Sequence, residues 1–185
     1  EQARMHLYRG QCNCSYWHGA FGGVYLPHLR NAAYGNLIQA EAMIERQTHP
    51  EPEWIEATAE DFNFDGAREV RLANEQLVTW IAPAAGGQIY GLDLRHTAHN
   101  LLATMQRRPE AYHQKIVDRE RQHADGAASI HDRVILKRDD LDQFLQSDNR
   151  LRKSLVDHFW DETALGDDIA SGRAAEHGDF ADGQW

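Results

Sequence analysis

Cysteine and long apolar runs are both scarce in this sequence. Cys12 and Cys14 are the only cysteines, and a disulfide between residues so close along the chain would be strained and would remove little entropy from the unfolded state. The sequence therefore predicts no disulfide framework and favours a reducing compartment. No segment approaches the roughly 20 apolar residues that a membrane helix needs, and no signal-peptide pattern opens the chain. We expect a cytoplasmic protein with no membrane partner.

Basic residues are also few relative to acidic ones. The 185 residues include 19 Lys and Arg against 29 Asp and Glu, a formal net charge of -10 at pH 7. Such a surface repels nucleic-acid phosphates, so nucleic acid is not expected as a partner. The length suits one domain with a sizeable core, or one domain and part of another. The chain begins with Glu1 and ends in a segment rich in Gly, Asp and Ala, so we expect both ends to be cut from a longer protein.

Helical periodicity is clearest over residues 27–47. Apolar side chains recur there at steps of three and four and would share one helical face, namely Leu29, Ala33, Leu37, Ala40 and Ile44. Pro27 suits the first turn of a helix, because its missing N–H would have no partner there. Residues 1–10 contain good helix formers and stop at Gly10, which predicts a second helix.

The pattern changes after the prolines of "THPEPEW". Four short, partly alternating segments follow, separated by the turn-like "NFDG", "NE" and "AAGG", at residues 54–62, 68–74, 76–83 and 88–95. Their spacing predicts an antiparallel meander within a β-sandwich rather than parallel βαβ units. We therefore predict a mixed fold with a helical segment over 1–47, a linker over 48–53 and a mostly antiparallel β-sandwich over 54–185.

The remaining segments give weaker patterns. "HTAHN", directly after the fourth segment, is typical of a turn, and a short helix is expected within residues 109–122. We also expect a strand over 133–137, a helical turn over 139–146 and a final strand over 153–160.

Several motifs occur in an order that resembles one enzyme family. They are "QCNCSYWHGAFGGVYLPHLRNAAYGNLIQAE", "DFNFDG", "HNLLATMQRRPEAYH", "SIHD" and "RKSLVDHF", and together they span residues 4 to about 160. This set resembles glycoside hydrolase family 57, which contains α-amylases and 4-α-glucanotransferases. The resemblance implies that the chain holds the end of a helical central subdomain and the first part of a galactose-mutarotase-like β-sandwich, which would be incomplete.

The resemblance also implies where the chemistry lies. The family carries a glutamate nucleophile and an aspartate acid/base on an N-terminal β/α barrel, which would lie upstream of Glu1. Retaining hydrolysis needs two carboxyl groups about 5 to 5.5 Å apart, and the sequence identifies no such pair. Acidic residues near turns are usually solvated or capping, so we assign no catalytic role to Asp61, Asp65, Glu110, Asp132 or Asp157. The resemblance implies an α-1,4-glucan or maltooligosaccharide as partner, and no cofactor or metal is expected.

The segment ahead of the long helix is the candidate binding site. Trp17, His18 and Asn13 provide an aromatic surface, an imidazole and an amide within six residues, the groups that a sugar subsite offers. Glycines nearby would let the backbone turn sharply. Packing of the helical segment would explain the same residues, but with the resemblance we predict that Trp17 stacks on a glucosyl ring and that His18 or Asn13 binds its hydroxyls. Three neighbours are expected in the core: Tyr16, Phe21 and Tyr25.

Other polar residues have alternative explanations. Cys14 stands where the family often has an acidic residue, and a thiol is no charged acceptor unless its pKa is lowered. Zinc bound by the two cysteines with histidines would need a second ligand cluster, which is missing. The clusters around Arg107 and Glu110, around 131–133 and at Asp157 and His158 are expected to be structural, the first through an Arg–Glu ion pair.

Two functions of different classes follow. The first is a fragment of a retaining α-glucan-processing hydrolase or 4-α-glucanotransferase, to which the chain contributes a substrate-lining loop and an accessory sandwich. The second is a non-catalytic carbohydrate-binding or interaction module with a mutarotase-like sandwich.

Overall fold

The computed structural model describes residues 1–17, 22–51, 53–117 and 144–183. The chain forms two compact units. The first comprises Glu1–Met105, Arg152–Asp161 and Glu176–Trp185, and the second comprises Gln106–Leu151 and Glu162–Ala175.

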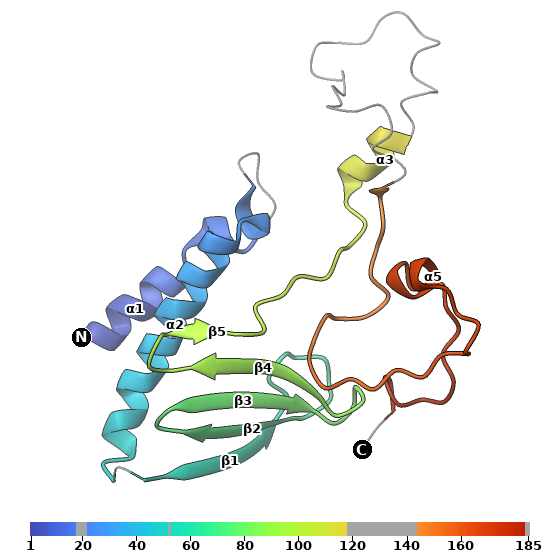
Figure 1. Cartoon of the computed structure of the whole chain (residues 1–185). Helices are drawn as coiled ribbons and strands as arrows, with labels where there is room; N and C mark the ends of the chain where they lie inside the picture. Colours follow the sequence, from blue (N-terminus) through green and yellow to red (C-terminus); the bar gives the residue numbers. More distant parts are fainter. Residues whose placement is uncertain (18–21, 52, 118–143, 184–185) are drawn as a thin grey trace, which may run out of the picture. The chain divides into compact units, whose positions relative to one another are not determined.

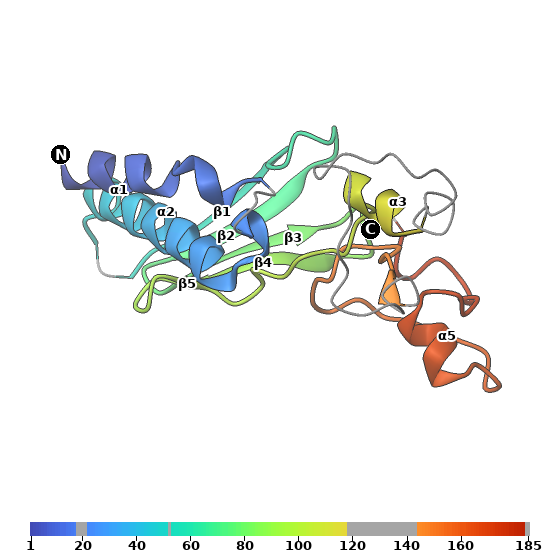
Figure 2. The ribbon, with the colours of Figure 1, turned by 90° about the horizontal axis from the view of Figure 1, so that it is seen from above.

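The first unit begins with two helices that lie side by side, α1 (Gln2–Gly10) and α2 (Pro27–Thr48), joined by a loop with two short 3-10 turns (Figures 1 and 2). A glycine allows the close approach of the two helices, because a Cβ atom on Gly10 would lie 2.6 Å from the Leu37 side chain. Both predicted helices are confirmed. No helix in the described part of the chain is both long and apolar enough to cross a membrane.

The predicted buried face of α2 is only partly correct. Ala33 and Ala40 are buried, whereas Ile44 is 53% exposed. The face against the sheet turns instead toward Ala42 and toward the carboxylates of Glu41 and Glu45, which bind arginines of the sheet. The helix therefore joins the sheet partly through polar contacts, which apolar periodicity does not detect.

The sheet is an antiparallel meander with the order β1-β2-β3-β4-β5. Its strands are β1 (Ile55–Glu60), β2 (Glu69–Asn74), β3 (Leu77–Ala82), β4 (Gln88–Leu94) and β5 (His99–Asn100). The four predicted strands are confirmed, and β5 is a two-residue strand in the second half of the stretch predicted as a turn. The mixed fold is therefore as expected, and the described residues contain one sheet, as an incomplete sandwich would.

The small core of this unit lies on the helix-facing side of the sheet. Ala73, Val78 and Trp80 are buried there, with Trp54 and Tyr90 packed against them. A β-bulge at Tyr90 shifts the register, so that Trp80 pairs with Gly91 and Ile81 with Ile89.

The C-terminal segments differ from expectation. Residues 153–160 form no strand, because Leu155 has a φ of 60°, which interrupts extended backbone; only the isolated bridges at Ser154 and Trp160 remain. Helix α3 (Ala111–Val117) confirms the short helix expected within 109–122. Helix α5 (Gly166–Ala170) is five residues long and was not predicted. The strand expected over 133–137 and most of the turn over 139–146 lie outside the described residues.

Candidate functional site

Two glycines in the loop between α1 and α2 have positive φ values. Gly22 and Gly23 have φ values of 106° and 52°, a region that favours glycine. A Cβ atom on Gly23 would lie 2.1 Å from the carbonyl oxygen of Trp17. The same carbonyl accepts a hydrogen bond from the Val24 N–H at 3.0 Å. The two halves of the loop are therefore held together at the backbone of Trp17.

The side chains of this loop point largely into solvent. Trp17 is 52% exposed, and Asn13, at the start of the first 3-10 turn (Asn13–Ser15), is also exposed. The third predicted binding residue, His18, lies outside the described residues. A tryptophan that is half exposed is unusual, because large aromatic side chains usually bury most of their area.

Of the loop residues expected in the core, Tyr16 was placed wrongly. It is 57% exposed, and its hydroxyl donates a hydrogen bond to the Gly10 carbonyl at 2.5 Å. The phenol thus ties the loop to the end of α1 without burying its ring. Tyr25 is half-buried, and Phe21 lies outside the described residues.

Arg30 supports the far side of the loop, a role that sequence reasoning missed. Its guanidinium donates to the Val24 carbonyl at 2.6 Å and lies 3.1 Å from the sulfur of Met105. These partners belong to the second 3-10 turn (Gly23–Tyr25) and to the chain after β5. An arginine on an otherwise amphipathic helix gives no sequence signal for such contacts.

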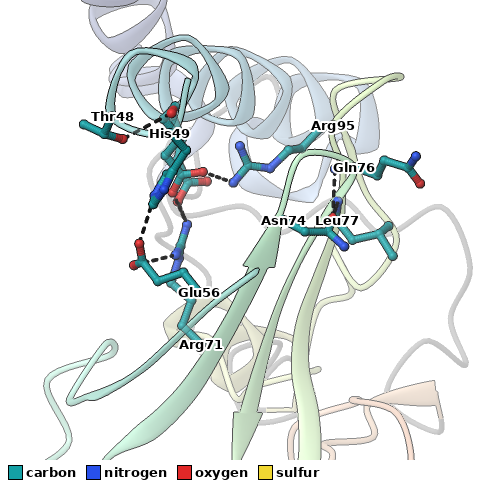
Figure 3. A network of polar contacts seen from close by, with 10 residues as sticks. Thr48, His49, Glu56, Arg71, Asn74, Gln76, Leu77 and Arg95 are labelled. Carbon is teal, nitrogen blue, oxygen red and sulfur yellow. Dashed lines mark hydrogen bonds and ion pairs between the residues drawn. The ribbon is translucent and has the colours of Figure 1, made fainter. Parts of the chain in front are cut away.

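A second polar cluster joins the C-terminal half of α2 to the sheet (Figure 3). Arg71 on β2 binds Glu41 at 2.7 Å and also binds Glu45, and Arg95, just after β4, binds the other oxygen of Glu45. Glu56 on β1 lies 3.7 Å from Arg71. We call these five residues the helix–sheet network.

Burial and the neighbouring carboxylates shift the pKa of Arg71 in opposite directions. Burial alone would lower the pKa of Arg71, but its hydrogen bonds to Glu41 and Glu45 and the charge of these carboxylates raise it overall. The side chains of Arg71 and Arg95 are only 10% and 4% exposed. Arg71 faces Glu41, Glu45 and Glu56, and Arg95 faces Glu45. The charges of both arginines are therefore compensated where they are buried.

The edge of this network carries a histidine and a tryptophan. His49 Nε2 lies 3.0 Å from a Glu56 oxygen, and its ring stacks on Trp54 with centroids 4.1 Å apart. The guanidinium carbon of Arg95 lies 5.5 Å from the Trp54 ring centroid. His49 lies near the start of the predicted linker over 48–53 and Trp54 directly follows it, so their stacking joins the two ends of this segment.

Asp93 on β4 is a buried carboxyl near the network. It is 4% exposed, and Asn100 donates a hydrogen bond to it at 2.6 Å. Burial raises the pKa of Asp93 to about 6, and the charge of Glu41 acts in the same direction, while Asn100, Arg95 and Arg71 lower it. Because Asp93 is buried and hydrogen-bonded to Asn100, we assign it a structural role.

The two acidic residues of "DFNFDG" cap a turn, as expected. Asp61 accepts hydrogen bonds from the backbone N–H groups of Asp65 and Gly66, both at 3.0 Å. Asp65 in turn accepts one from the Ala67 N–H at 2.8 Å. Among the residues that the structure describes, no group of three or more His, Cys, Asp or Glu side chains is arranged to hold a metal ion.

The remaining polar candidates form ion pairs or hydrogen bonds. Arg107 pairs with Asp148 at 2.5 Å, and the Glu110 N–H donates to His113 Nδ1 at 3.1 Å. His158 pairs with Glu176 at 2.5 Å. Residues 131–133 lie outside the described part of the chain.

Comparisons with known proteins agree with the motifs. Residues 61–185 match the family model described as alpha-amylase/4-alpha-glucanotransferase, C-terminal, and residues 1–44 match the middle domain of the same family. The 4-alpha-glucanotransferase of Thermococcus kodakarensis is 35% identical over 185 residues, which cover 100% of this chain and 27% of the relative. The alpha-amylase of Pyrococcus abyssi is 36% identical over 185 residues, which cover 98% of this chain and 27% of the relative.

A solved structure shows the same arrangement. The crystal structure of 4-alpha-glucanotransferase from Thermococcus litoralis is similar with a TM-score of 0.74 and 31% identity, over 97% of this chain and 24% of that chain. The chain thus spans about a quarter of the length of the relatives it matches. The resemblance seen in the motifs is confirmed, and the chain belongs to the alpha-amylase/4-alpha-glucanotransferase family.

Proposed function

We propose that this chain is part of an α-glucan-processing enzyme that breaks α-1,4 bonds by a retaining mechanism and passes the glycosyl group to water or to a second glucan. The observation that carries the proposal is the 35% identity to a 4-alpha-glucanotransferase over the whole chain. Because the chain spans about a quarter of such relatives, the two catalytic carboxyl groups that this mechanism requires are assigned to the part outside residues 1–185. The protein acts in the cytoplasm on maltooligosaccharides.

Within this enzyme, the loop between α1 and α2 lines the glucan site. Trp17 provides the stacking surface for a glucosyl ring, and His18 and Asn13 bind hydroxyls. The exposure of Trp17 and the hydrogen bond between its carbonyl and the Val24 N–H support this role, because an aromatic platform must be open to the ligand and must keep its orientation when the ligand is absent.

The helical segment over 1–47 and the sheet-bearing segment over 54–185 are separate domains of this enzyme, with 48–53 as the linker. The matched ranges 1–44 and 61–185 support this division. The segment after the helices then provides a scaffold that supports the loop through α2, rather than catalytic groups.

The test is an assay of the full-length protein on a single maltooligosaccharide, with the products separated by length. We expect both longer and shorter oligosaccharides from transfer, or only shorter ones from hydrolysis. Residues 1–185 prepared alone, with folding verified by circular dichroism, should give no turnover. Glucan binding by the full-length protein without any product would support the binding module instead, and turnover by residues 1–185 would contradict our placement of the catalytic groups.

A further inference from the structure

The guanidinium of Arg30, a half-buried residue, contacts neutral groups only. Its Nη1 atom donates to the Val24 carbonyl at 2.6 Å and to the sulfur of Met105 at 3.1 Å. Its Nε atom is buried and has no hydrogen-bond partner among the described residues. Arg71 and Arg95 pair with carboxylates, but the ion pairs within the described part of the chain do not include Arg30. Charge compensation therefore does not explain an arginine at this position.

Val24 connects Arg30 to the predicted stacking residue. Its carbonyl accepts the hydrogen bond from Arg30, and its N–H donates to the Trp17 carbonyl at 3.0 Å. Hydrogen bonds from charged donors are short and strong, and the bond from Arg30 is of this kind. Arg30 itself lies in the first turn of α2 (Pro27–Thr48). Two hydrogen bonds in series therefore run from a regular helix to the backbone of Trp17.

The orientation of Trp17 depends on its backbone, because the residue is 52% exposed and its ring packs over only part of its surface. The preceding Tyr16 attaches the loop to α1 through its hydroxyl, which donates to the Gly10 carbonyl at 2.5 Å. The loop is thus attached to α1 just before Trp17, and to α2 through Val24 and Arg30. Removal of Arg30 would free the loop on the α2 side.

We propose that Arg30 is a positioning residue for glucan binding, which acts through the backbone of Val24 and holds Trp17 in the orientation that stacks on a glucosyl ring. This inference rests on the proposed role of Trp17 in the glucan site. If only a fraction of the free protein has the competent orientation, the apparent dissociation constant rises by the inverse of that fraction. A protein that has bound the glucan has already selected this orientation. Loss of Arg30 therefore raises KM and leaves kcat unchanged.

Steady-state assays of the full-length protein on one maltooligosaccharide test this role. Arg30→Met removes every donor but keeps an unbranched side chain, and Arg46→Met is the matched control, because Arg46 is exposed in the last turn of the same helix. We expect Arg30→Met to raise KM about tenfold, with kcat within about twofold of the wild type, because a hydrogen bond from a charged donor is lost. Arg46→Met should change neither constant. A wild-type KM in Arg30→Met, with or without a fall in kcat, would overturn the proposal.

The double variant Trp17→Ala with Arg30→Met tests whether Arg30 acts through Trp17. Residues that act as one unit have non-additive effects, so Arg30→Met should leave KM unchanged in the Trp17→Ala background. The same rise in KM in both backgrounds would overturn the proposal. A wild-type KM in Trp17→Ala alone would contradict the glucan site and this inference with it, whereas a raised KM in Trp17→Ala beside a wild-type KM in Arg30→Met would contradict only the role of Arg30.

Hydrogen exchange of the full-length protein gives a readout that needs no substrate. In Arg30→Met, the Val24 amide that donates to Trp17 should lose protection, while amides in the last turn of α2 should exchange as in the wild type. Arg30→Lys is measured as a milder variant, because it keeps the charge but shortens the reach of the donor, and it should change the protection of Val24 in the same direction. Unchanged protection of Val24 in both variants would overturn the proposal.

Discussion

Gly23 shows how much a single residue can determine in the loop. Its φ of 52° is one that an L-residue adopts only with strain, and a Cβ atom would also clash with the Trp17 carbonyl oxygen at 2.1 Å. The orientation of the predicted stacking surface therefore depends on a hydrogen atom at this position. Gly66, in the turn between β1 and β2, has a φ of 92° but nothing within 4 Å of its Cβ position.

These two glycines make a matched pair of variants. Gly66→Ala should cost about 1 kcal/mol or somewhat more from backbone strain alone. Gly23→Ala adds a steric clash that only a shift of the loop can relieve, so we expect a larger fall in the melting temperature and loss of amide protection in the loop residues by hydrogen exchange. Equal effects of the two substitutions would contradict the close approach of Gly23 to Trp17.

Asp93 gives the first unit a predictable pH dependence. Its folded-state pKa of about 6 lies above the ordinary value of 3.8 because of burial. The folded state therefore binds more protons than the unfolded state between these values, and the contribution of Asp93 to stability falls as the pH rises from about 4 to about 6.

The variant that tests this is Asp93→Asn, because its amide oxygen can still accept the hydrogen bond from Asn100. Relative to the wild type, the variant should gain stability between pH 4 and pH 7 by roughly 3 kcal/mol at most, from about 1.4 kcal/mol per pKa unit. The free energy of unfolding is measured for both proteins at the two pH values. A difference that stays constant with pH would show that folding does not raise the pKa of Asp93.

Burial of single residues was the least predictable property. Tyr16 and Ile44 carry large apolar side chains and were expected inside, yet both are more than half exposed. Conversely, Arg71 and Arg95 are buried, because carboxylates from another element meet them. Sequence supplies the hydrophobicity of a residue but not its spatial neighbours, and the neighbours decide these four cases.

At the scale of elements, the helix–sheet network attaches α2 to the sheet. Glu45 is its centre, since it binds both Arg71 and Arg95 and is 15% exposed. Glu56 contacts Arg71 from the side and is 39% exposed. Losing one partner of a buried ion pair leaves an uncompensated charge, whereas an exposed pair contributes little.

Glu45→Gln tests the buried ion pairs of the network, and Glu56→Gln tests the exposed one. Glu45→Gln should destabilise the unit by about 3 kcal/mol, because two buried guanidinium groups lose their shared counter-charge. Glu56→Gln should cost about 1 kcal/mol or less. Urea unfolding of both variants is the measurement, and a Glu45→Gln variant as stable as Glu56→Gln would mean that the network does not hold the helix on the sheet.

Elements with a local pattern were predictable, and those fixed by distant contacts were not. Helices α1 and α2 and strands β1 to β4 follow from periodicity and turn residues within a few positions. The carboxylates of α2 lie 26 to 50 residues away from the arginines that they bind in the helix–sheet network, so the local sequence gives no signal for these contacts. Residues 153–160 have a strand-like composition, but they form no strand. The positive φ of Leu155 interrupts the extended backbone.

At the scale of the whole molecule, the chain spans about a quarter of the length of the relatives it matches, and in our proposal the catalytic groups lie outside residues 1–185. The family followed from the motif order in the sequence. The candidate site was likewise predictable in part: the sequence located the loop and the exposed Trp17, but not the support from Arg30.

The most direct test of the proposed glucan site compares three full-length proteins on one maltooligosaccharide: the wild type, Trp17→Ala and Phe64→Ala. Phe64 is the control, because it is 91% exposed and lies in the turn between β1 and β2. Loss of an aromatic stacking surface costs on the order of 1 to 3 kcal/mol, so kcat/KM should fall by about 5- to 150-fold in Trp17→Ala and stay unchanged in Phe64→Ala. Wild-type values of both kcat and KM in Trp17→Ala would contradict the role of this loop in binding the glucan.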